Sequence, residues 1–295
     1  MAIFKGSGVA LVTPMKEDGS INYEVLGELI EYHIANDTDA IIICGTSGEA
    51  PTLDDDEHLE AIRYTIEKTA QRIPVIAGTG SNNTAHAIMM SQEAEKMGAD
   101  AVLLVTPYYN KATQNGLIRH FTAIANSISI PCILYNVPSR TGTNILPETV
   151  VTLAKTVPNI VAIKEASGNF SQVAKLASLA QGCIDIYSGN DDQIVPLCSL
   201  GGLGVISVLA NVAPKETHDM VYACLEGRYE EACAIQLKAI PLIDQLFCEV
   251  NPIPAKAALN LLGWNCGIPR LPLTEMEAAH QENLARELKA FGCRK

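Results

Sequence analysis

The sequence predicts an α/β fold, a TIM (β/α)8 barrel followed by a small C-terminal helical subdomain. Short apolar runs rich in valine and isoleucine alternate with longer segments of helical periodicity, which is typical of parallel strands joined by crossover helices. Eight such units fit within residues 1–227, a length close to the roughly 250 residues that are usual for this barrel. The whole chain of 295 residues is long enough to bury one large core.

Each unit begins with a short apolar run bounded by polar residues, glycine or proline, as expected of a buried strand. The eight strands are expected at residues 9–13, 40–44, 75–77, 101–105, 132–136, 160–164, 184–188 and 204–208. The eight helices that follow them are expected at residues 23–35, 56–71, 84–97, 116–127, 147–156, 170–181, 191–200 and 214–226. The alternative is an open, doubly wound sheet. It is disfavoured because such a sheet usually has fewer strands, and because no glycine-rich dinucleotide-binding motif follows the first run.

The periodicity changes near Arg228, where the alternation of strands and helices ends. Beyond this point the apolar residues keep a helical spacing, which is interrupted at residues 251–254 and 263–272, both containing proline. This pattern predicts about three appended helices. The expected division is a barrel domain at residues 1–227 and a helical subdomain at residues 228–295.

Composition and charge exclude several classes of protein. The net charge of −12 at pH 7, with scattered Lys and Arg, lacks the basic patch that binds a phosphate backbone, so we expect no nucleic-acid partner. No apolar stretch approaches the roughly 18 residues that span a bilayer, and the N-terminus has no apolar signal core, so we expect no membrane partner and a cytoplasmic location. The nine cysteines form no CxxC pair and are expected to be buried, reduced thiols. The six histidines form no ligand-spaced cluster, which predicts no metal.

Lys164 is the most informative residue of the predicted barrel. It closes the apolar run at residues 160–163 and precedes a small polar segment at residues 165–169, so a strand delivers one amine to a loop. Because TIM-barrel active sites lie at the C-terminal ends of the strands, this amine is expected at the catalytic end. A neutral lysine between apolar walls can attack a carbonyl carbon. The alternative is a structural lysine, exposed at the strand end or paired with Glu165.

Polar segments follow three other predicted strands at the same end. Residues 45–49 offer two hydroxyls and flanking glycines that let backbone amides approach a small carboxylate. Residues 106–110 and 135–142 add three tyrosines and Arg140. A phenol can move protons and an arginine can bind a carboxylate through two hydrogen bonds, so with Lys164 they fit attack on a ketone. Taken singly, an ordinary turn, packed tyrosines and a solvated arginine are the alternatives.

These segments also resemble the signatures of the dihydrodipicolinate synthase family, also called 4-hydroxy-tetrahydrodipicolinate synthase, within the N-acetylneuraminate lyase superfamily. Similar segments run nearly end to end, at residues 45–49, 106–110, 135–142, 163–166, 188–189, 204–208 and 251–254. The resemblance implies a TIM-barrel lyase without a cofactor, assembled as a homotetramer of two tight dimers. It also implies condensation of pyruvate with L-aspartate 4-semialdehyde to 4-hydroxy-tetrahydrodipicolinate, the first committed step of diaminopimelate and lysine biosynthesis.

The resemblance implies catalytic roles for four residues. Lys164 attacks the pyruvate ketone, loses water to form a Schiff base, and tautomerises to an enamine that is the carbon nucleophile. Tyr135, Thr46 and Tyr109 match the proton relay of the family, in which Tyr109 reaches in from the neighbouring subunit. Oligomerisation would then complete the site, and the sequence alone does not distinguish a tetramer from a tight dimer.

Four further residues match substrate-binding positions of the family. Ser47 lies where a hydroxyl residue is near the pyruvate carboxylate, and the backbone of Gly189 and Ile206 matches the pyruvate end of the site. Arg140 matches the arginine that holds the carboxylate of the semialdehyde. Threonine is commoner than serine at position 47. Because β-branching stiffens threonine, Ser47 is expected to hold the carboxylate slightly less firmly.

Another set of residues matches the pocket in which feedback-inhibited members of the family bind lysine. Its candidate residues are Pro51, Asp55, His58, Asn82, His86 and Tyr108. Asp55 stands where some members have histidine, and His86 stands where inhibited members have the glutamate that pairs with the α-ammonium of lysine. These differences predict weak or absent inhibition by lysine. The alternative is that both changes are tolerated.

Two other functions are open at this point. An N-acetylneuraminate lyase or a keto-sugar-acid aldolase would use the same lysine and pyruvate with a different aldehyde. Lyases of that group tend to lack the arginine found here as Arg140, and the double tyrosine also argues against them. A non-catalytic barrel that senses a small acid would leave Lys164 unmodified by pyruvate and borohydride.

Overall fold

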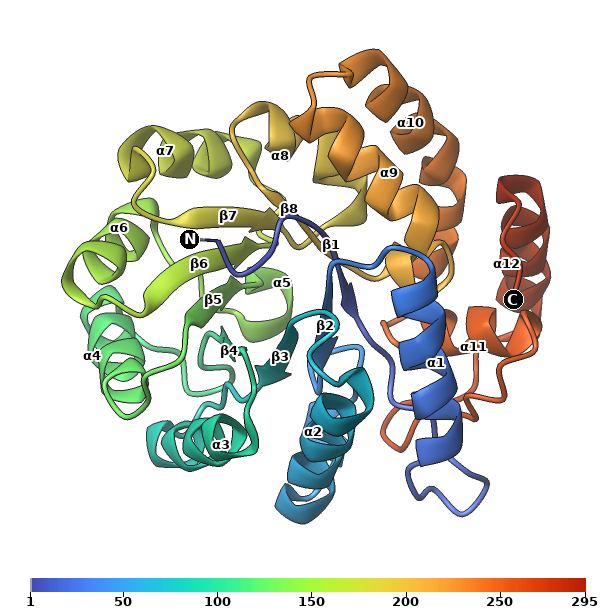
Figure 1. Ribbon diagram of the computed structural model, residues 1–295, viewed down its shortest axis with the longest axis horizontal. Coiled ribbons are helices and arrows are strands. Elements are labelled where there is room, and N and C mark those ends of the chain that lie inside the picture. Colours follow the sequence, from blue (N-terminus) through green and yellow to red (C-terminus); the bar gives the residue numbers. More distant parts are fainter. Residues whose placement is uncertain (1) are drawn as a thin grey trace.

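The fold is a closed barrel of eight parallel strands, each paired with the next and the last paired with the first (Figure 1). The computed structural model describes residues 2–295. The strands are β1 (Gly6–Ala10), β2 (Ala40–Ile43), β3 (Val75–Gly78), β4 (Ala101–Val105), β5 (Cys132–Asn136), β6 (Ile160–Glu165), β7 (Asp185–Ser188) and β8 (Gly204–Ser207). Their closed order confirms the predicted α/β barrel.

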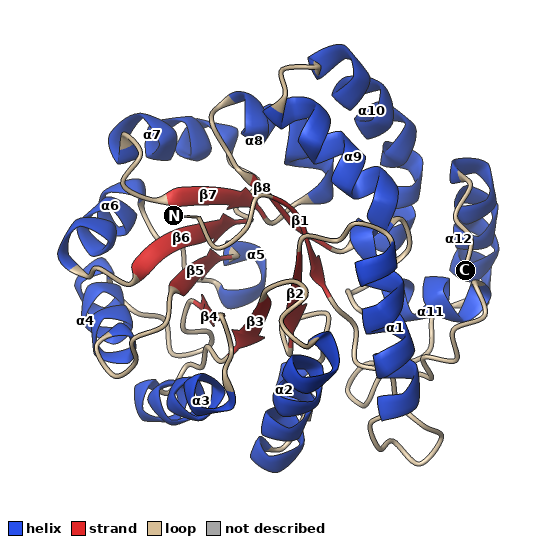
Figure 2. Ribbon diagram, in the orientation of Figure 1, coloured by secondary structure: helices blue, strands red, loops and turns tan. Residues whose placement is uncertain are grey.

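Helices surround the barrel and cover its outer face (Figure 2). The helices that follow the strands are α1 (Tyr23–Ala35), α2 (Asp55–Thr69), α3 (Thr84–Met97), α4 (Gln114–Ala125), α5 (Pro138–Thr141), α6 (Pro147–Thr156), α7 (Phe170–Ala180), α8 (Ile194–Ser199) and α9 (Pro214–Leu225). Three short 3-10 turns are η1 (Ala50–Thr52), η2 (Asp191–Gln193) and η3 (Leu209–Asn211). The sequence does not predict α5, because four residues are too few to show helical periodicity.

The first strand is the largest error of the sequence prediction. It is expected at residues 9–13 but lies at Gly6–Ala10, where glycine and serine interrupt the apolar pattern. Glycine is required at its contact with β8, because a Cβ on Gly204 would lie only 1.9 Å from the Gly6 carbonyl oxygen. Close approach of two backbones therefore replaces the apolar side chains by which a strand is usually predicted.

Smaller boundary errors lie at the catalytic end of the barrel. The sixth strand continues one residue past Lys164, to Glu165, and the helix expected at residues 191–200 is divided into η2 and α8. The expectation of buried cysteines holds for five of the nine and fails for the others, of which two are partly exposed. Cys233 on α10 (Tyr229–Leu246) and Cys248 just after it are exposed, because this helix presents one side to solvent.

Two apolar cores lie on opposite sides of the strands. The larger core fills the space between strands and helices, and the smaller core fills the barrel itself. At the N-terminal end of the barrel, Phe4 stacks on Tyr187 with ring centroids 4.4 Å apart, and the Tyr187 hydroxyl donates to the Phe4 carbonyl at 2.6 Å. Aromatic packing therefore fills this end, which leaves the opposite end for a polar site.

Three helices follow the barrel, as the sequence predicts. They are α10 (Tyr229–Leu246), α11 (Ile253–Leu261) and α12 (Ala278–Phe291). Helix α10 contacts α8 and α9, and α11 and α12 both contact α10. The segment between α10 and α11 reaches the C-terminal ends of the strands, where Phe247 and Asn251 line a cavity. No helix within residues 2–295 is long and apolar enough to cross a membrane.

Candidate active site

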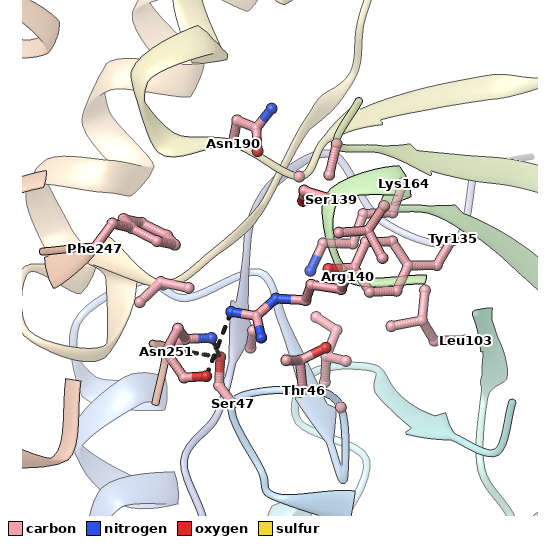
Figure 3. Close-up of a pocket in the computed structure, with 17 residues that line it drawn as sticks. Thr46, Ser47, Leu103, Tyr135, Ser139, Arg140, Lys164, Asn190, Phe247 and Asn251 are labelled. Atoms are coloured by element: carbon pink, nitrogen blue, oxygen red, sulfur yellow. Dashed lines mark hydrogen bonds between the residues drawn. The ribbon is translucent and has the colours of Figure 1, made fainter. Parts of the chain in front are cut away.

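A cavity of about 180 Å³ opens at the C-terminal ends of the strands (Figure 3). Six of the eight residues to which the sequence assigns catalytic or substrate-binding roles line it, namely Thr46, Ser47, Tyr135, Arg140, Lys164 and Gly189. The apolar part of its wall comes from residues in and near the barrel interior and from the residue just after α10, among them Ala10, Ile42, Leu103, Val137 and Phe247. The cavity thus combines an apolar floor with a few convergent polar groups, as small-molecule sites usually do.

Lys164 and Tyr135 lie side by side at the base of the cavity. They are opposite residues of the neighbouring strands β6 and β5, so their side chains point to the same face, into the barrel. The Lys164 Nζ is 4.4 Å from the centre of the Tyr135 ring. Both side chains are almost fully enclosed, with residue exposures of 5% and 6%. The strand register therefore places an amine against a phenol inside an apolar enclosure.

Glu165 is not the partner of Lys164. It follows Lys164 in the strand and points to the opposite face, where its carboxylate accepts from the Asn136 side-chain amide at 3.1 Å and from the Ser167 backbone N–H at 2.7 Å. Among residues 2–295, no carboxylate lies within salt-bridge distance of the Lys164 amine. The structural alternative of an ordinary Lys164–Glu165 ion pair is therefore wrong.

Gly189 leaves room for the lysine side chain. It follows β7, and a Cβ at this position would lie 3.1 Å from Lys164 Cε and 2.6 Å from the Ala166 Cβ. Both distances are shorter than ordinary carbon contacts, so a larger residue would displace the amine or the chain that carries Ala166. The absence of a side chain at Gly189 thus sets the path of Lys164.

The loop after β2 brings two hydroxyl groups to the cavity. Ser47 is buried, and its hydroxyl accepts a hydrogen bond from the Asn251 side-chain amide at 3.0 Å, while Thr46 is partly exposed beside it. The guanidinium of Arg140, carried by α5, reaches the same place and donates to the Asn251 carbonyl at 3.4 Å (Figure 3). One side of the cavity therefore presents two hydroxyls and a cation, which are groups that bind carboxylates.

Ile206 and Tyr109 do not line the cavity. Ile206 is fully buried in the barrel core. The end of its strand is fixed by Asp191, whose buried carboxylate accepts from the Ser207 hydroxyl at 2.6 Å and the Val208 N–H at 3.0 Å. Burial raises the pKa of Asp191, and these hydrogen bonds oppose that shift. Tyr109 is 95% exposed in a left-handed turn with φ 69°, so its ring points away from this chain.

Sequence reasoning missed Asn251, Phe247, Asn190 and Ser139 as cavity residues. Asn251 is the most informative of them, because it touches both Ser47 and Arg140. From the residue pattern, its segment, residues 251–254, is predicted as an interruption of the helical periodicity. The only available signal was its resemblance to a family segment, and this assigns no contact.

A second cavity of about 520 Å³ lies beside the first and shares Thr46, Tyr135 and Arg140 with it. Five of the six candidate lysine-pocket residues line this cavity, namely Pro51, Asp55, His58, His86 and Tyr108. The sixth, Asn82, does not line it, but its side chain donates to the Tyr108 carbonyl at 3.1 Å.

Three ionisable groups of the second cavity are already engaged. His86 Nε2 is 2.9 Å from the Asp55 carboxylate on the exposed side. His58 is buried and donates from Nε2 to the Gly78 carbonyl at 2.8 Å, and burial lowers its pKa. Within the described chain, no group of three His, Cys, Asp or Glu side chains is arranged to hold a metal ion.

Comparisons with known proteins all match this chain to one family. The model of the dihydrodipicolinate synthetase family matches residues 3–291. The chain is 63% identical to the 4-hydroxy-tetrahydrodipicolinate synthase of Lachnoclostridium phytofermentans, over 99% of both chains. It is 60% identical to the enzyme of that name from Caldicellulosiruptor saccharolyticus, over 99% of this chain and 98% of the relative.

Solved structures agree with this result. The dihydrodipicolinate synthase of Aquifex aeolicus superposes with a TM-score of 0.96 at 44% identity, covering 98% of each chain. The chloride-inhibited enzyme of Acinetobacter baumannii, solved in complex with pyruvate, gives the same TM-score at 44% identity, covering 98% of this chain and 99% of that one. By sequence along almost its entire length and by fold, this chain belongs to the dihydrodipicolinate synthetase family.

Proposed function

We propose that this chain is a lyase that condenses pyruvate with L-aspartate 4-semialdehyde to 4-hydroxy-tetrahydrodipicolinate in diaminopimelate and lysine biosynthesis. The observation that carries the proposal is the enclosed Lys164 amine, which contacts the Tyr135 ring and has no carboxylate partner among residues 2–295. The names of the close relatives and the pyruvate complex of the A. baumannii enzyme support it. The cavity of about 180 Å³ suits two small molecules held side by side.

The first half of the reaction makes a carbon nucleophile from pyruvate. The neutral Lys164 nitrogen attacks the ketone carbon, a C–N bond forms, and the carbinolamine loses water to give an imine. Protonation of the imine nitrogen makes an electron sink, so the methyl group loses a proton and the enamine forms. We assign the movement of these protons to Tyr135, with Thr46 and a partner-subunit tyrosine equivalent to Tyr109 completing the relay. This chemistry requires no metal or nucleotide cofactor.

The second half joins the two substrates. The enamine carbon attacks the aldehyde carbon of the semialdehyde, whose oxygen takes a proton, and the substrate amine then displaces Lys164 from the imine to close the ring. We assign the semialdehyde carboxylate to Arg140 and the pyruvate carboxylate to Ser47 with the backbone of Gly189, and we keep the backbone of Ile206 as a further contact on the family resemblance alone. Holding both molecules in one cavity removes much of the entropic barrier of a bimolecular encounter.

We infer that the working assembly contains a tight dimer, and that two such dimers form a homotetramer. The support is Tyr109, an aromatic residue 95% exposed at the catalytic end of its own chain, where burial by a neighbouring subunit would remove it from water. Tyr109→Phe is expected to reduce kcat at least about tenfold with little change in sedimentation, since only the hydroxyl is lost. Unchanged kcat would remove Tyr109 from the relay.

We also propose a domain boundary near Arg228, with a barrel at residues 1–227 and a helical subdomain at residues 228–295. The support is the change from alternating strands and helices to helices alone. A biosynthetic role on small soluble substrates favours action in the cytoplasm, with pyruvate and the semialdehyde as its partners.

The alternative aldolase function is tested by substrate choice. The purified enzyme with pyruvate is offered L-aspartate 4-semialdehyde in a reductase-coupled assay, and N-acetylneuraminate is offered separately in the cleavage direction. The proposal predicts turnover of the semialdehyde and kcat/KM at least about 10³-fold lower for the sugar acid, because a site built for one polar partner rejects another. Faster cleavage of the sugar acid would instead favour the hypothesis of an N-acetylneuraminate lyase.

We propose that lysine inhibits this enzyme weakly or not at all. His86 and Asp55 bind each other in the second cavity, so the Asp55 carboxylate is engaged before any ammonium group could reach it. His86→Glu restores a carboxylate at that position and is expected to lower the inhibitory concentration of lysine at least about tenfold, by adding an ion pair. Sub-millimolar inhibition of the unaltered enzyme would contradict the proposal.

A further inference from the structure

The loop that carries Thr46 and Ser47 is held in an unusual backbone conformation. Glu49, near its end, has φ 57°, in the left-handed region that residues other than glycine seldom adopt without support. The Gly48 carbonyl, just before it, accepts a hydrogen bond from the Thr13 hydroxyl at 2.8 Å. Hydrogen bonds within the loop, such as that from the Glu49 N–H to the Thr46 carbonyl at 3.2 Å, also support it, and further contacts come from the other end of the chain.

Glu49 has a completely buried carboxylate, and both of its oxygens are bonded. One oxygen accepts from Lys256 Nζ at 2.8 Å, and the other accepts from the Arg270 backbone N–H at 2.8 Å. The exposures of the Glu49 and Lys256 side chains are 0% and 1%, so solvent does not screen this ion pair. Two residues that are 207 positions apart therefore form one enclosed contact.

Lys256 belongs to α11, and its amine also donates to the Ile268 carbonyl at 3.1 Å. Burial lowers the pKa of Lys256, and the neighbouring Glu49 carboxylate opposes this shift. The amine is thus fixed between a carboxylate of the barrel and a carbonyl of its own subdomain. Its position connects the β2 loop to the helices that follow the barrel.

Arg270 binds the same loop at its C-terminal end, after Glu49. Its guanidinium donates to the Thr52 carbonyl at 2.7 Å and to both oxygens of the Glu57 carboxylate at 2.6 and 2.7 Å. It also donates to the Gly19 carbonyl at 2.8 and 2.9 Å. Together with Glu49, these contacts hold residues on both sides of η1.

The same C-terminal region also reaches the cavity. Asn251, which donates to the Ser47 hydroxyl at 3.0 Å, lies just before α11, and Lys256 lies in the first turns of that helix. One short stretch of chain thus touches the loop at Ser47 and again at Glu49. The spacing between these two contacts is set by a helix, which is a rigid support.

We propose that Glu49 and Lys256 are positioning residues for the condensation. Their buried ion pair fixes the β2 loop against α11, so that Thr46 and Ser47 keep the geometry that bound pyruvate requires. Neither residue touches the reacting atoms, because neither lines the cavity that contains Lys164; Glu49 lines only the second cavity. This inference rests on the proposed function.

A purely stabilising role makes a different prediction. Buried ion pairs can often be replaced by apolar residues of similar size without loss of stability, so stability alone does not require charges here. If the pair only stabilises the fold, activity below the melting temperature should follow the folded fraction. If the pair positions the loop, kinetic constants should change in molecules that are fully folded.

Glu49→Gln tests the inference directly. It keeps the size of the side chain but presents an amide to Lys256, so the loop is expected to shift. The KM for pyruvate should rise about tenfold or more and kcat should fall, since errors of about 1 Å in position can cost 10²-fold in rate. The KM for the semialdehyde should change less than about threefold, because its carboxylate is assigned to Arg140. Circular dichroism and a melting curve must show a folded protein at the assay temperature.

Two further proteins keep the test decisive. The double variant Glu49→Leu with Lys256→Met removes both charges, so that neither is left buried alone if the single variant fails to fold. Leu176→Ala, in α7 on the other side of the barrel from α2 (Figure 1), opens a cavity in the outer core and serves as a control for general destabilisation. The double variant should keep the raised KM for pyruvate, whereas the α7 variant should have unaltered kinetic constants.

Borohydride trapping with pyruvate distinguishes failure of the proposed function from failure of the positioning role. If pyruvate is not trapped on the unaltered protein, the proposed function fails. If the unaltered protein is trapped and the Glu49 and double variants are trapped equally fast with an unaltered KM for pyruvate, the positioning role is overturned. Slower trapping in both variants, with normal trapping in Leu176→Ala, is the result that we expect.

Discussion

Two buried lysines of this chain show how one residue type serves two purposes. Lys164 lies at the end of β6 inside the barrel, where its amine contacts the Tyr135 ring and, within residues 2–295, meets no carboxylate. Lys256 lies in α11, where its amine binds the Glu49 carboxylate and the Ile268 carbonyl. Burial alone therefore does not identify a nucleophilic lysine.

The partner decides what each amine can do. A carboxylate favours the charged ammonium form, which donates hydrogen bonds but cannot attack a carbonyl carbon. The Lys164 amine has a phenol ring beside it instead of a carboxylate, and it lines the cavity, where a ketone can reach it. Lys256 is thus suited to holding two parts of the fold together, and Lys164 is suited to covalent chemistry.

Removal of Lys164 should have the largest effect on activity. Lys164→Ala is expected to lower kcat at least about 10³-fold, because no other amine is placed to form the imine. The melting temperature should stay the same or rise, since no ion pair is lost. Activity is measured in the coupled assay and stability by calorimetry. Substantial remaining activity that depends on pyruvate would contradict the role of this amine.

Removing Lys256 should mainly cost stability, in addition to the raised KM for pyruvate that its positioning role predicts. Lys256→Ala leaves the Glu49 carboxylate buried without its cation, so the free energy of unfolding should fall by about 3–5 kcal/mol. Urea denaturation measures this change at neutral pH. Trapping of pyruvate should still be found at Lys164 in whatever fraction remains folded. A change in stability below about 1 kcal/mol would mean that the pair is solvated in solution.

Gly189→Ala tests whether Lys164 needs the space that glycine leaves, because the new methyl group would crowd its side chain. The new methyl group would lie 3.1 Å from Lys164 Cε, so the amine should move and kcat/KM for pyruvate should fall about 10- to 100-fold. Gly116→Ala in α4 is the control. Its methyl group meets its nearest neighbours at 3.4 Å, and alanine in a helix should add up to about 1 kcal/mol of stability without affecting kinetics.

A buried histidine extends the comparison to a group that must stay neutral. His33 is fully buried with its Nδ1 2.9 Å from the Thr38 hydroxyl, and burial lowers its pKa to about 3. The unfolded chain takes up a proton near pH 6.5 and the folded chain does not. Stability therefore falls as the pH drops below about 6.5, by about 2.7 kcal/mol at pH of about 4.5.

His33→Asn removes this titrating group while keeping a short polar side chain. The variant should lose stability less steeply than the unaltered protein between about pH 6.5 and about 4.5, by roughly one proton. Melting curves across this range provide the measurement. Equal slopes in the two proteins would show that His33 is protonated in the folded state.

The fold was largely predictable because its signals are local. Apolar runs separated by helical segments predict seven of the eight strands closely, and the error at β1 arises where Gly6 approaches Gly204. Lys164, Tyr135 and Arg140 were predictable for the same reason, because each lies at or just after the end of an apolar run. The geometry of the barrel then brings such residues to one end.

The unpredicted parts of the site depend on contacts between distant residues. Asn251 meets Ser47 across 204 positions, and Lys256 meets Glu49 across 207, so neither pair leaves a periodic pattern in the sequence. Tyr109 is a different case. Its exposed ring acquires a function only from a second subunit, and its expected role came from resemblance to the family.

The most direct test uses pyruvate and sodium borohydride on the unaltered enzyme, followed by peptide mass spectrometry. We predict one reduced pyruvate adduct on the peptide that contains Lys164, none on the peptide that contains Lys256, and no adduct in Lys164→Ala. Modification of Lys256, or an intact mass that pyruvate and borohydride leave unchanged, would contradict the assignment of Lys164 as the nucleophile.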